Sequence, residues 1–88
     1  DFDYDRARRI LENVVARHPA QPEPLAELAR LYHHWSRSPY KASQKAYGPR
    51  ADELLRQAER AAPGHPLVNA YRAERALDLA DFVEAQRA

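Results

Sequence analysis

Two stretches of this 88-residue chain repeat one spaced pattern of small and large side chains. The first stretch holds Ala7, Leu11, Val14 and Pro19, and the second holds Ala51, Leu55, Ala58 and Pro63, each 44 positions after its counterpart. Separations of three and four residues bring side chains to one face of an α-helix, and proline commonly follows a helix end. A pattern that returns at a fixed interval indicates a chain built from repeated helical units.

The composition also favours helices over strands. Ala is the best helix former and supplies 17 residues, whereas four Val and one Ile are too few for several strands. Each of the seven prolines is expected to begin or end a helix. We predict an all-α fold with helices at about 3–17, 22–36, 49–61 and 66–79, a fifth helix from Asp81 and a shorter one over 39–47. Ile, Leu, Val and Phe total only 16 residues. The chain must therefore pack small residues closely or bury apolar surface against a neighbour.

The segment between the two stretches completes a recognisable helical motif. One face of it carries Leu25, Leu28, Ala29 and Tyr32. Followed by Ala51, Leu55 and Pro63, this order resembles the tetratricopeptide repeat, a helix-turn-helix unit of about 34 residues. The resemblance implies an α-solenoid of antiparallel helix pairs that forms a single domain. Residues 1–19 would supply the second helix of a partial repeat, 22–63 a complete repeat and 66–88 a further partial repeat.

Two features depart from the family pattern. The interval of 44 residues exceeds the usual repeat by about ten, which places an insertion near 36–50, between the two helices of the complete repeat. The residues 44 positions after Leu25 and Leu28 are Asn69 and Arg72, so the orientation of the third inner helix stays open. A helical bundle without repeats, with an Ala-rich core, remains the alternative fold.

The resemblance implies that a peptide or partner helix binds in a concave groove lined by the inner helices. The candidate groove residues are Glu23, Glu27, Arg30, His33, His34, Leu67, Tyr71, Glu74, Leu77 and Asp78. They combine apolar contact points with a mildly acidic character, and we predict a non-enzymatic protein interaction scaffold. A solvated polar helix face would have the same sequence. Arg30 is the only fixed cation in the set, which argues against the capture of a chaperone tail carboxylate known in some family members.

A basic, aromatic segment offers an alternative function. Residues 28–51 contain five basic and no acidic side chains, so this segment carries a charge of +5 and the remainder −4. The candidates are Trp35, Arg37, Tyr40, Lys41, Lys45 and Tyr47. Aromatic rings beside a basic track can stack on the bases of single-stranded nucleic acid or accompany a phosphate ligand. The simpler interpretation is that the tyrosines cover the end of the core while the lysines stay solvated.

The sequence offers little for catalysis, metals or cofactors. There is no cysteine, and Gly48 and Gly64 are the only glycines, so thiolate chemistry and a glycine-rich phosphate loop are excluded. His33 and His34 are adjacent and point apart on a helix, whereas metal pairs usually sit four residues apart. We expect no enzyme activity, no cofactor, no metal and no membrane insertion. Self-association through open solenoid ends is a further expectation, with Phe2, Tyr4 and Phe82 on those ends.

Overall fold

The computed structural model describes residues 3–37 and 47–87, with backbone only for 82–87. These residues form four α-helices, and no strand occurs among them. The helices are α1 (Tyr4–Arg17), α2 (Pro22–Ser36), α3 (Tyr47–Ala61) and α4 (Pro66–Arg87). The prediction of an all-α fold is confirmed. None of the described helices combines the length and the hydropathy that a membrane span needs.

Local sequence explains where the helices begin and turn. Asp3 caps α1, because its carboxylate accepts a hydrogen bond of 3.0 Å from the backbone N–H of Arg6. Proline occupies the first position of α2, where its missing N–H costs nothing. Between α3 and α4 the backbone of Gly64 takes a φ of 78°, a left-handed conformation that glycine adopts without strain. Short connections join α1 to α2 and α3 to α4 and turn each of these helices back against the next.

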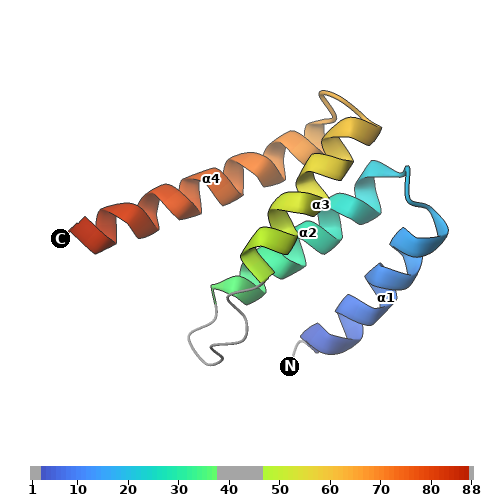
Figure 1. Cartoon of the computed structure of the whole chain (residues 1–88), viewed down its shortest axis with the longest axis horizontal. Coiled ribbons are helices and arrows are strands. Elements are labelled where there is room, and N and C mark those ends of the chain that lie inside the picture. The colour runs from blue at the N-terminus through green and yellow to red at the C-terminus, as the bar shows by residue number, and fades with distance from the viewer. Residues whose placement is uncertain (1–2, 38–46, 88) are drawn as a thin grey trace.

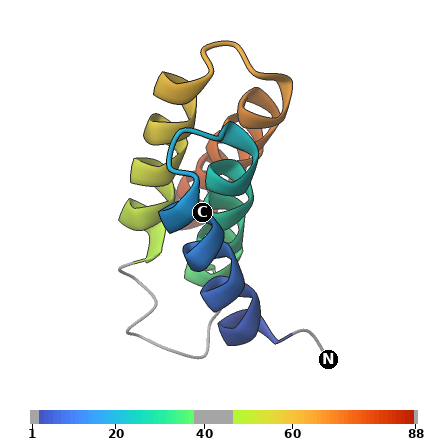
Figure 2. The same ribbon diagram turned by 90° about the vertical axis from the view of Figure 1, so that its right-hand side faces the viewer.

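The central helix of the fold is α2. It packs most extensively on α3, and it also contacts α1 and α4. Figures 1 and 2 show α1 and α4 on opposite sides of the α2–α3 pair, and no contact joins α1 to α4 among the described residues. Each outer helix therefore has one face against the central pair and another face free of the described chain.

The core lies between α2 and α3 and is completed by the start of α4. Its buried members are Leu25, Ala26, Leu28, Ala29, Leu31, Tyr32, Ala51, Leu54, Leu55, Ala58 and Val68. The alanines allow α2 and α3 to approach closely, so larger neighbours fill the remaining space at native packing density. Both Leu28 and Leu54 are fully buried. The repeated small residues thus serve as helix contacts, which is how a chain with few large apolar residues obtains a core.

The predicted helix break before Asp81 is wrong, because α4 continues as one helix of 22 residues to Arg87. The segment after Pro66 contains neither proline nor glycine and is rich in Ala, Leu, Glu and Arg, so nothing in it ends a helix. The described residues therefore hold four helices and not five. The shorter helix predicted over 39–47 lies outside the described residues, except that Tyr47 begins α3.

Candidate binding face along α2

A row of polar contacts joins α2 to α4, and we call it the α2–α4 ladder. The Tyr71 hydroxyl donates a hydrogen bond of 2.7 Å to Glu27, and Arg30 Nε donates one of 3.1 Å to Glu74. Each pair is separated by 44 residues, the interval of the sequence repeat. Positions related by this 44-residue offset therefore meet between α2 and α4. The structure brings together four of the candidate groove residues in these two contacts.

Arg30 lies at the centre of the ladder. Its second nitrogen, Nη2, lies 3.4 Å from Glu74, and its guanidinium carbon lies 5.1 Å from the centre of the Tyr71 ring. His34 Nε2 also approaches Glu74 at 3.4 Å. Because Arg30 hydrogen-bonds the ionised carboxylate, the pKa of Glu74 falls below its ordinary value. The Arg30 side chain is 42% exposed, so it remains accessible to a second partner.

His33 faces the interior of the helix packing, where its residue surface is only 2% exposed. Its Nδ1 lies 2.9 Å from Arg75 Nη1, and its Nε2 lies 2.7 Å from Asp78 Oδ2. A guanidinium can only donate, so Nδ1 must accept and the proton of the neutral ring must sit on Nε2, donating to Asp78. The hydrogen bond from His33, followed by that from Arg37, lowers the pKa of Asp78. His33 is thus a structural link between α2 and α4.

Arg75 ties three helices together beneath this link. Besides His33 it binds both carboxylate oxygens of Asp52 on α3, and its Nη2 donates to the Gly48 carbonyl at 3.1 Å. This pairing lowers the pKa of Asp52. A Cβ at Gly48 would lie 3.3 Å from the Arg75 guanidinium, which is a tight approach. Sequence analysis did not single out Arg75, because an arginine 23 residues from an aspartate gives no local pattern that would identify the pair.

The ladder is closed at the start of α4 by another histidine. His65 Nδ1 accepts the backbone N–H of Leu67 at 3.2 Å, so its Nε2 carries the proton and donates to Glu23 at 3.0 Å. The remaining candidate groove residues differ in environment. Leu67 is half-buried against the core, whereas Leu77 is 67% exposed. Most of the polar candidates therefore satisfy one another, and Leu77 lies free of the described core.

A surface groove of about 300 Å³ runs between α1 and α2, and we call it the α1–α2 groove. Its lining residues are Tyr4, Ala7, Leu11, Glu27, Arg30, Leu31 and His34. Small and apolar side chains from both helices form part of this lining, and the α2 residues of the ladder supply the polar part. Sequence analysis placed Glu27, Arg30 and His34 on a binding face but did not assign the α1 side. The repeated pattern could have identified it, because Ala7 and Leu11 correspond to buried residues of α3.

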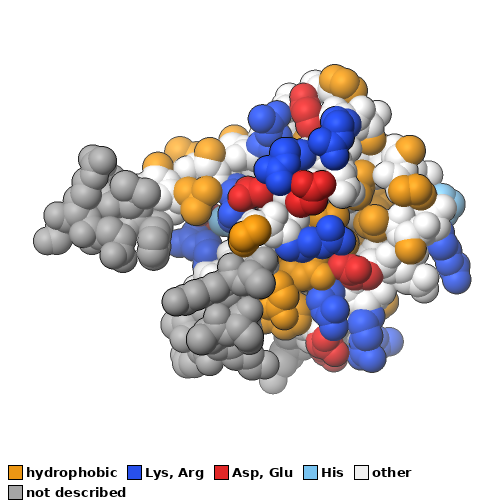
Figure 3. Space-filling view, viewed as in Figure 1, with side chains coloured by type: hydrophobic (Ala, Val, Ile, Leu, Met, Phe, Trp, Pro, Cys, Tyr) orange, Lys and Arg blue, Asp and Glu red, His pale blue; other side chains and the backbone are white. Residues whose placement is uncertain are grey.

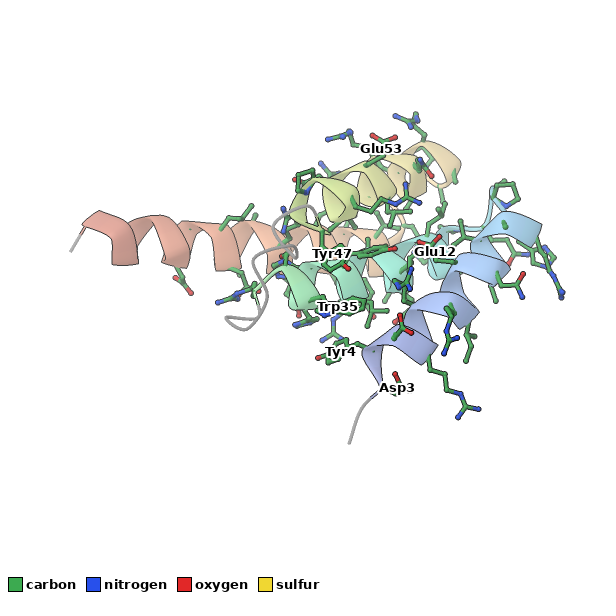
Figure 4. The ribbon with its side chains drawn as sticks, turned by 60° about the horizontal axis from the view of Figure 1, so that its bottom comes forward. Asp3, Tyr4, Glu12, Trp35, Tyr47 and Glu53 are labelled. Carbon is green, nitrogen blue, oxygen red and sulfur yellow. The ribbon has the colours of Figure 1, made fainter. Side chains whose placement is uncertain are left out.

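The aromatic candidates stack on one another where α1, α2 and α3 meet (Figure 4). The rings of Trp35 and Tyr47 are stacked with centres 4.8 Å apart, and Tyr32 and Tyr4 continue the row at 5.3 and 5.8 Å. Tyr32 also donates a hydrogen bond of 2.6 Å to Glu12. These contacts hold the helix ends together.

The charged members of the basic segment divide between described and undescribed residues. Arg37 lies 2.8 Å from Asp78 and caps the end of α2. Tyr40, Lys41 and Lys45 lie outside the described residues. On the face shown in Figure 3, basic and acidic side chains alternate around α3, where Arg56 contacts Glu53 at 2.9 Å. On this face the basic and acidic side chains of the described residues are therefore interspersed.

No group of three potential metal ligands occurs among the described residues. The Ser36 hydroxyl donates to the backbone carbonyl of His33 at 2.7 Å. A scan against protein-family models, a search of curated proteins and a search of solved structures each returned no match. The function is therefore argued from the helix faces and the grooves of this chain itself.

Proposed function

We propose that this chain is a tetratricopeptide-like helical repeat unit with a non-enzymatic role, and that it binds a helix or peptide of a protein partner in the α1–α2 groove. The single observation that carries the proposal is the composition of this groove. Ala7, Leu11 and Leu31 provide apolar surface, and Glu27 and Arg30 stand beside it with opposite charges. Apolar burial would supply affinity, and the charged pair would fix the register of the partner.

The repeat assignment is supported by the way the helices use the pattern residues. Leu28, Ala29, Ala51 and Ala58 are all fully buried where α2 and α3 pack. The 44-residue offset also describes which side chains of α2 and α4 meet. The helices line up as second helix, first helix, second helix and first helix of successive repeats. In such an array a groove beside a first helix is the natural position for a further helix.

Selection of a displayed random peptide library against the immobilised chain tests the binding role. We expect recovered peptides with helical spacing of apolar residues, and a loss of affinity of about tenfold on Arg30→Glu, equal to about 1.4 kcal/mol. Tyr71→Ala should also weaken binding, because it removes the ring beneath Arg30. Arg56→Glu on the exposed face of α3 is the matched control. Peptides that bind all three variants as well as the original chain would place the site elsewhere.

A further inference from the structure

One apolar face of α1 is only partly covered among the described residues, whereas its counterpart on α3 is buried. The α3 face consists of Ala51, Leu54, Leu55 and Ala58, whose exposed fractions are 0, 0, 6 and 0%. The residues 44 positions earlier are Ala7, Ile10, Leu11 and Val14. Ile10 is 55% exposed, whereas Leu54 at the equivalent position is completely buried by α2. The α1 face thus has the composition of a helix contact, and no helix among the described residues covers Ile10.

An exposed side also exists on α4, and it corresponds in part to the face with which α2 covers α3, because Asn69 and Arg72 stand where α2 has Leu25 and Leu28. Ala29 of α2 is fully buried, and Ala73 of α4, 44 positions later, is exposed. Ala70, Ala76 and Leu77 on the same side of α4 are exposed as well. Val68 and Arg75, by contrast, are buried against the central pair. The described structure therefore carries a partly covered apolar face on α1 and an exposed row of small and apolar side chains on α4.

We infer that these two faces bind each other between copies of this chain, with α4 of one copy lying in the α1–α2 groove of the next. The inference rests on the proposed function and names the partner helix. A contact between two different faces is heterologous, so copies would add head to tail. Figure 1 shows the two helices on opposite sides of the α2–α3 pair, which leaves both faces accessible at once.

The sizes of the side chains on the two faces complement each other. Gly48 and Ala58 of α3 have the larger counterparts Tyr4 and Val14 on α1. The α4 face is the smaller one, because the position equivalent to Tyr32 of α2 is Ala76. In the contact inside one chain, α2 supplies the larger side chains. In the contact between copies, α1 would supply them. Close packing depends on the summed volume of the two surfaces and permits this exchange.

The charges complement each other in the same register. In the groove, Glu27 and Arg30 of α2 stand beside α1. An α4 helix placed there with the repeat offset brings Glu74 of the second copy to Arg30. Glu74 already accepts from Arg30 of its own chain at 3.1 Å, and a carboxylate can accept a second hydrogen bond. Arg30 would then lie between two glutamates. Its guanidinium has five N–H donors and can bind both carboxylates at once.

Two single substitutions test the inference. Ile10→Asp places a charge on the α1 face, and Ala73→Arg places a long cation on the α4 face; both positions are exposed in one copy, so the fold should be retained. The original chain should gain mass with concentration in analytical ultracentrifugation. Each variant alone should remain a monomer, but an equimolar mixture should form a species of two chains and nothing larger, because each variant keeps the face that the other lacks.

The controls carry the same charges away from the two faces. Ala16→Asp lies on the exposed side of α1, and Ala20→Arg lies in the exposed turn that follows it. Both controls should associate as the original chain does. A monomeric original chain at millimolar concentration overturns the inference but leaves the proposed function open to the peptide selection. Association that persists in the single variants, or a mixture that stays monomeric, also overturns it.

Discussion

The two interfaces that α2 makes with α3 and α4 are held by different forces. Against α3 it buries a continuous set of Leu and Ala side chains, and burial of apolar surface contributes free energy without demanding a precise geometry. Against α4 it places Arg30, His33 and Glu27 opposite polar partners, and such contacts contribute little net energy but fix the register. The first interface thus supplies stability, and the second sets the position of α4.

The largest expected effect comes from the apolar interface. Leu28→Ala removes a fully buried side chain from the α2–α3 contact and should lower the free energy of unfolding by about 2–5 kcal/mol. Urea denaturation followed by circular dichroism measures the loss, and helix propensity changes little. Leu77→Ala is the matched control, because Leu77 is 67% exposed and should cost no more than about 0.5 kcal/mol. Equal losses for both variants would contradict the division between the interfaces.

A smaller effect is expected from the buried arginine at the polar interface. Arg75→Met keeps the length of the side chain but leaves His33 and the Gly48 carbonyl without their donor, at a cost of about 1–3 kcal/mol. Amide hydrogen exchange should accelerate more in α4 than in α3, because α3 keeps its apolar contact. Arg72→Met provides the control, since Arg72 is largely exposed and lies 3.5 Å from its carboxylate partner. Uniform acceleration in both helices would show that Arg75 supports the whole fold.

Acidification should affect the two interfaces unequally. Asp52, Glu74 and Asp78 have pKa values below the ordinary carboxyl range, because basic side chains across the interface bind their ionised forms. A lowered folded-state pKa means that the stabilising contribution is present above the unfolded pKa of about 4 and is lost as the pH falls through the folded value. Contacts of α4 should therefore weaken below about pH 4 while the α2–α3 core persists.

Replacement of one carboxylate by the corresponding amide measures how much the ladder contributes to the acid sensitivity. Glu74→Gln removes the ionisable group that Arg30 binds, so the free energy of unfolding should depend less steeply on pH between about 2 and 5 than in the original chain. Glu23→Gln is the control, because Glu23 lies at the exposed start of α2 and contacts only His65 among the described pairs. Identical pH profiles for the original chain and the Glu74 variant would remove the ladder as the source of acid sensitivity.

The sequence predicted the fold better than the state of the candidate site. Helix positions followed from proline placement and from the 44-residue pattern, because both report backbone conformation and buried faces. The same offset identified Glu27 and Tyr71, or Arg30 and Glu74, as equivalent positions without showing that they bind each other. A periodic polar stripe indicates which face avoids the core, but it does not indicate whether partners on a neighbouring helix satisfy it.

Two further features of the structure that the sequence did not predict have the same physical origin. The burial of His33 depends on Arg75 and Asp78, which lie more than 40 residues away and meet it only after the helices pack. The α1–α2 groove arises because α1 has no neighbour on one side among the described residues, a property of tertiary arrangement. Local patterns determine helices, whereas long-range polar pairs and uncovered faces depend on how the helices are placed.

The smallest expected effect concerns a single rung of the ladder. Tyr71→Phe removes the hydroxyl that donates to Glu27, and because both groups are accessible to water the cost should be about 0.5–1 kcal/mol. The ring would still lie beneath Arg30, so the cation–π contact at 5.1 Å is retained. A double-mutant cycle with Glu27→Ala isolates the hydrogen bond, and the two substitutions should be less costly together than their sum. Strict additivity would mean that this contact sets register without contributing stability, and the polar interface would then depend on its remaining contacts, such as those of Arg30, His33 and Arg75.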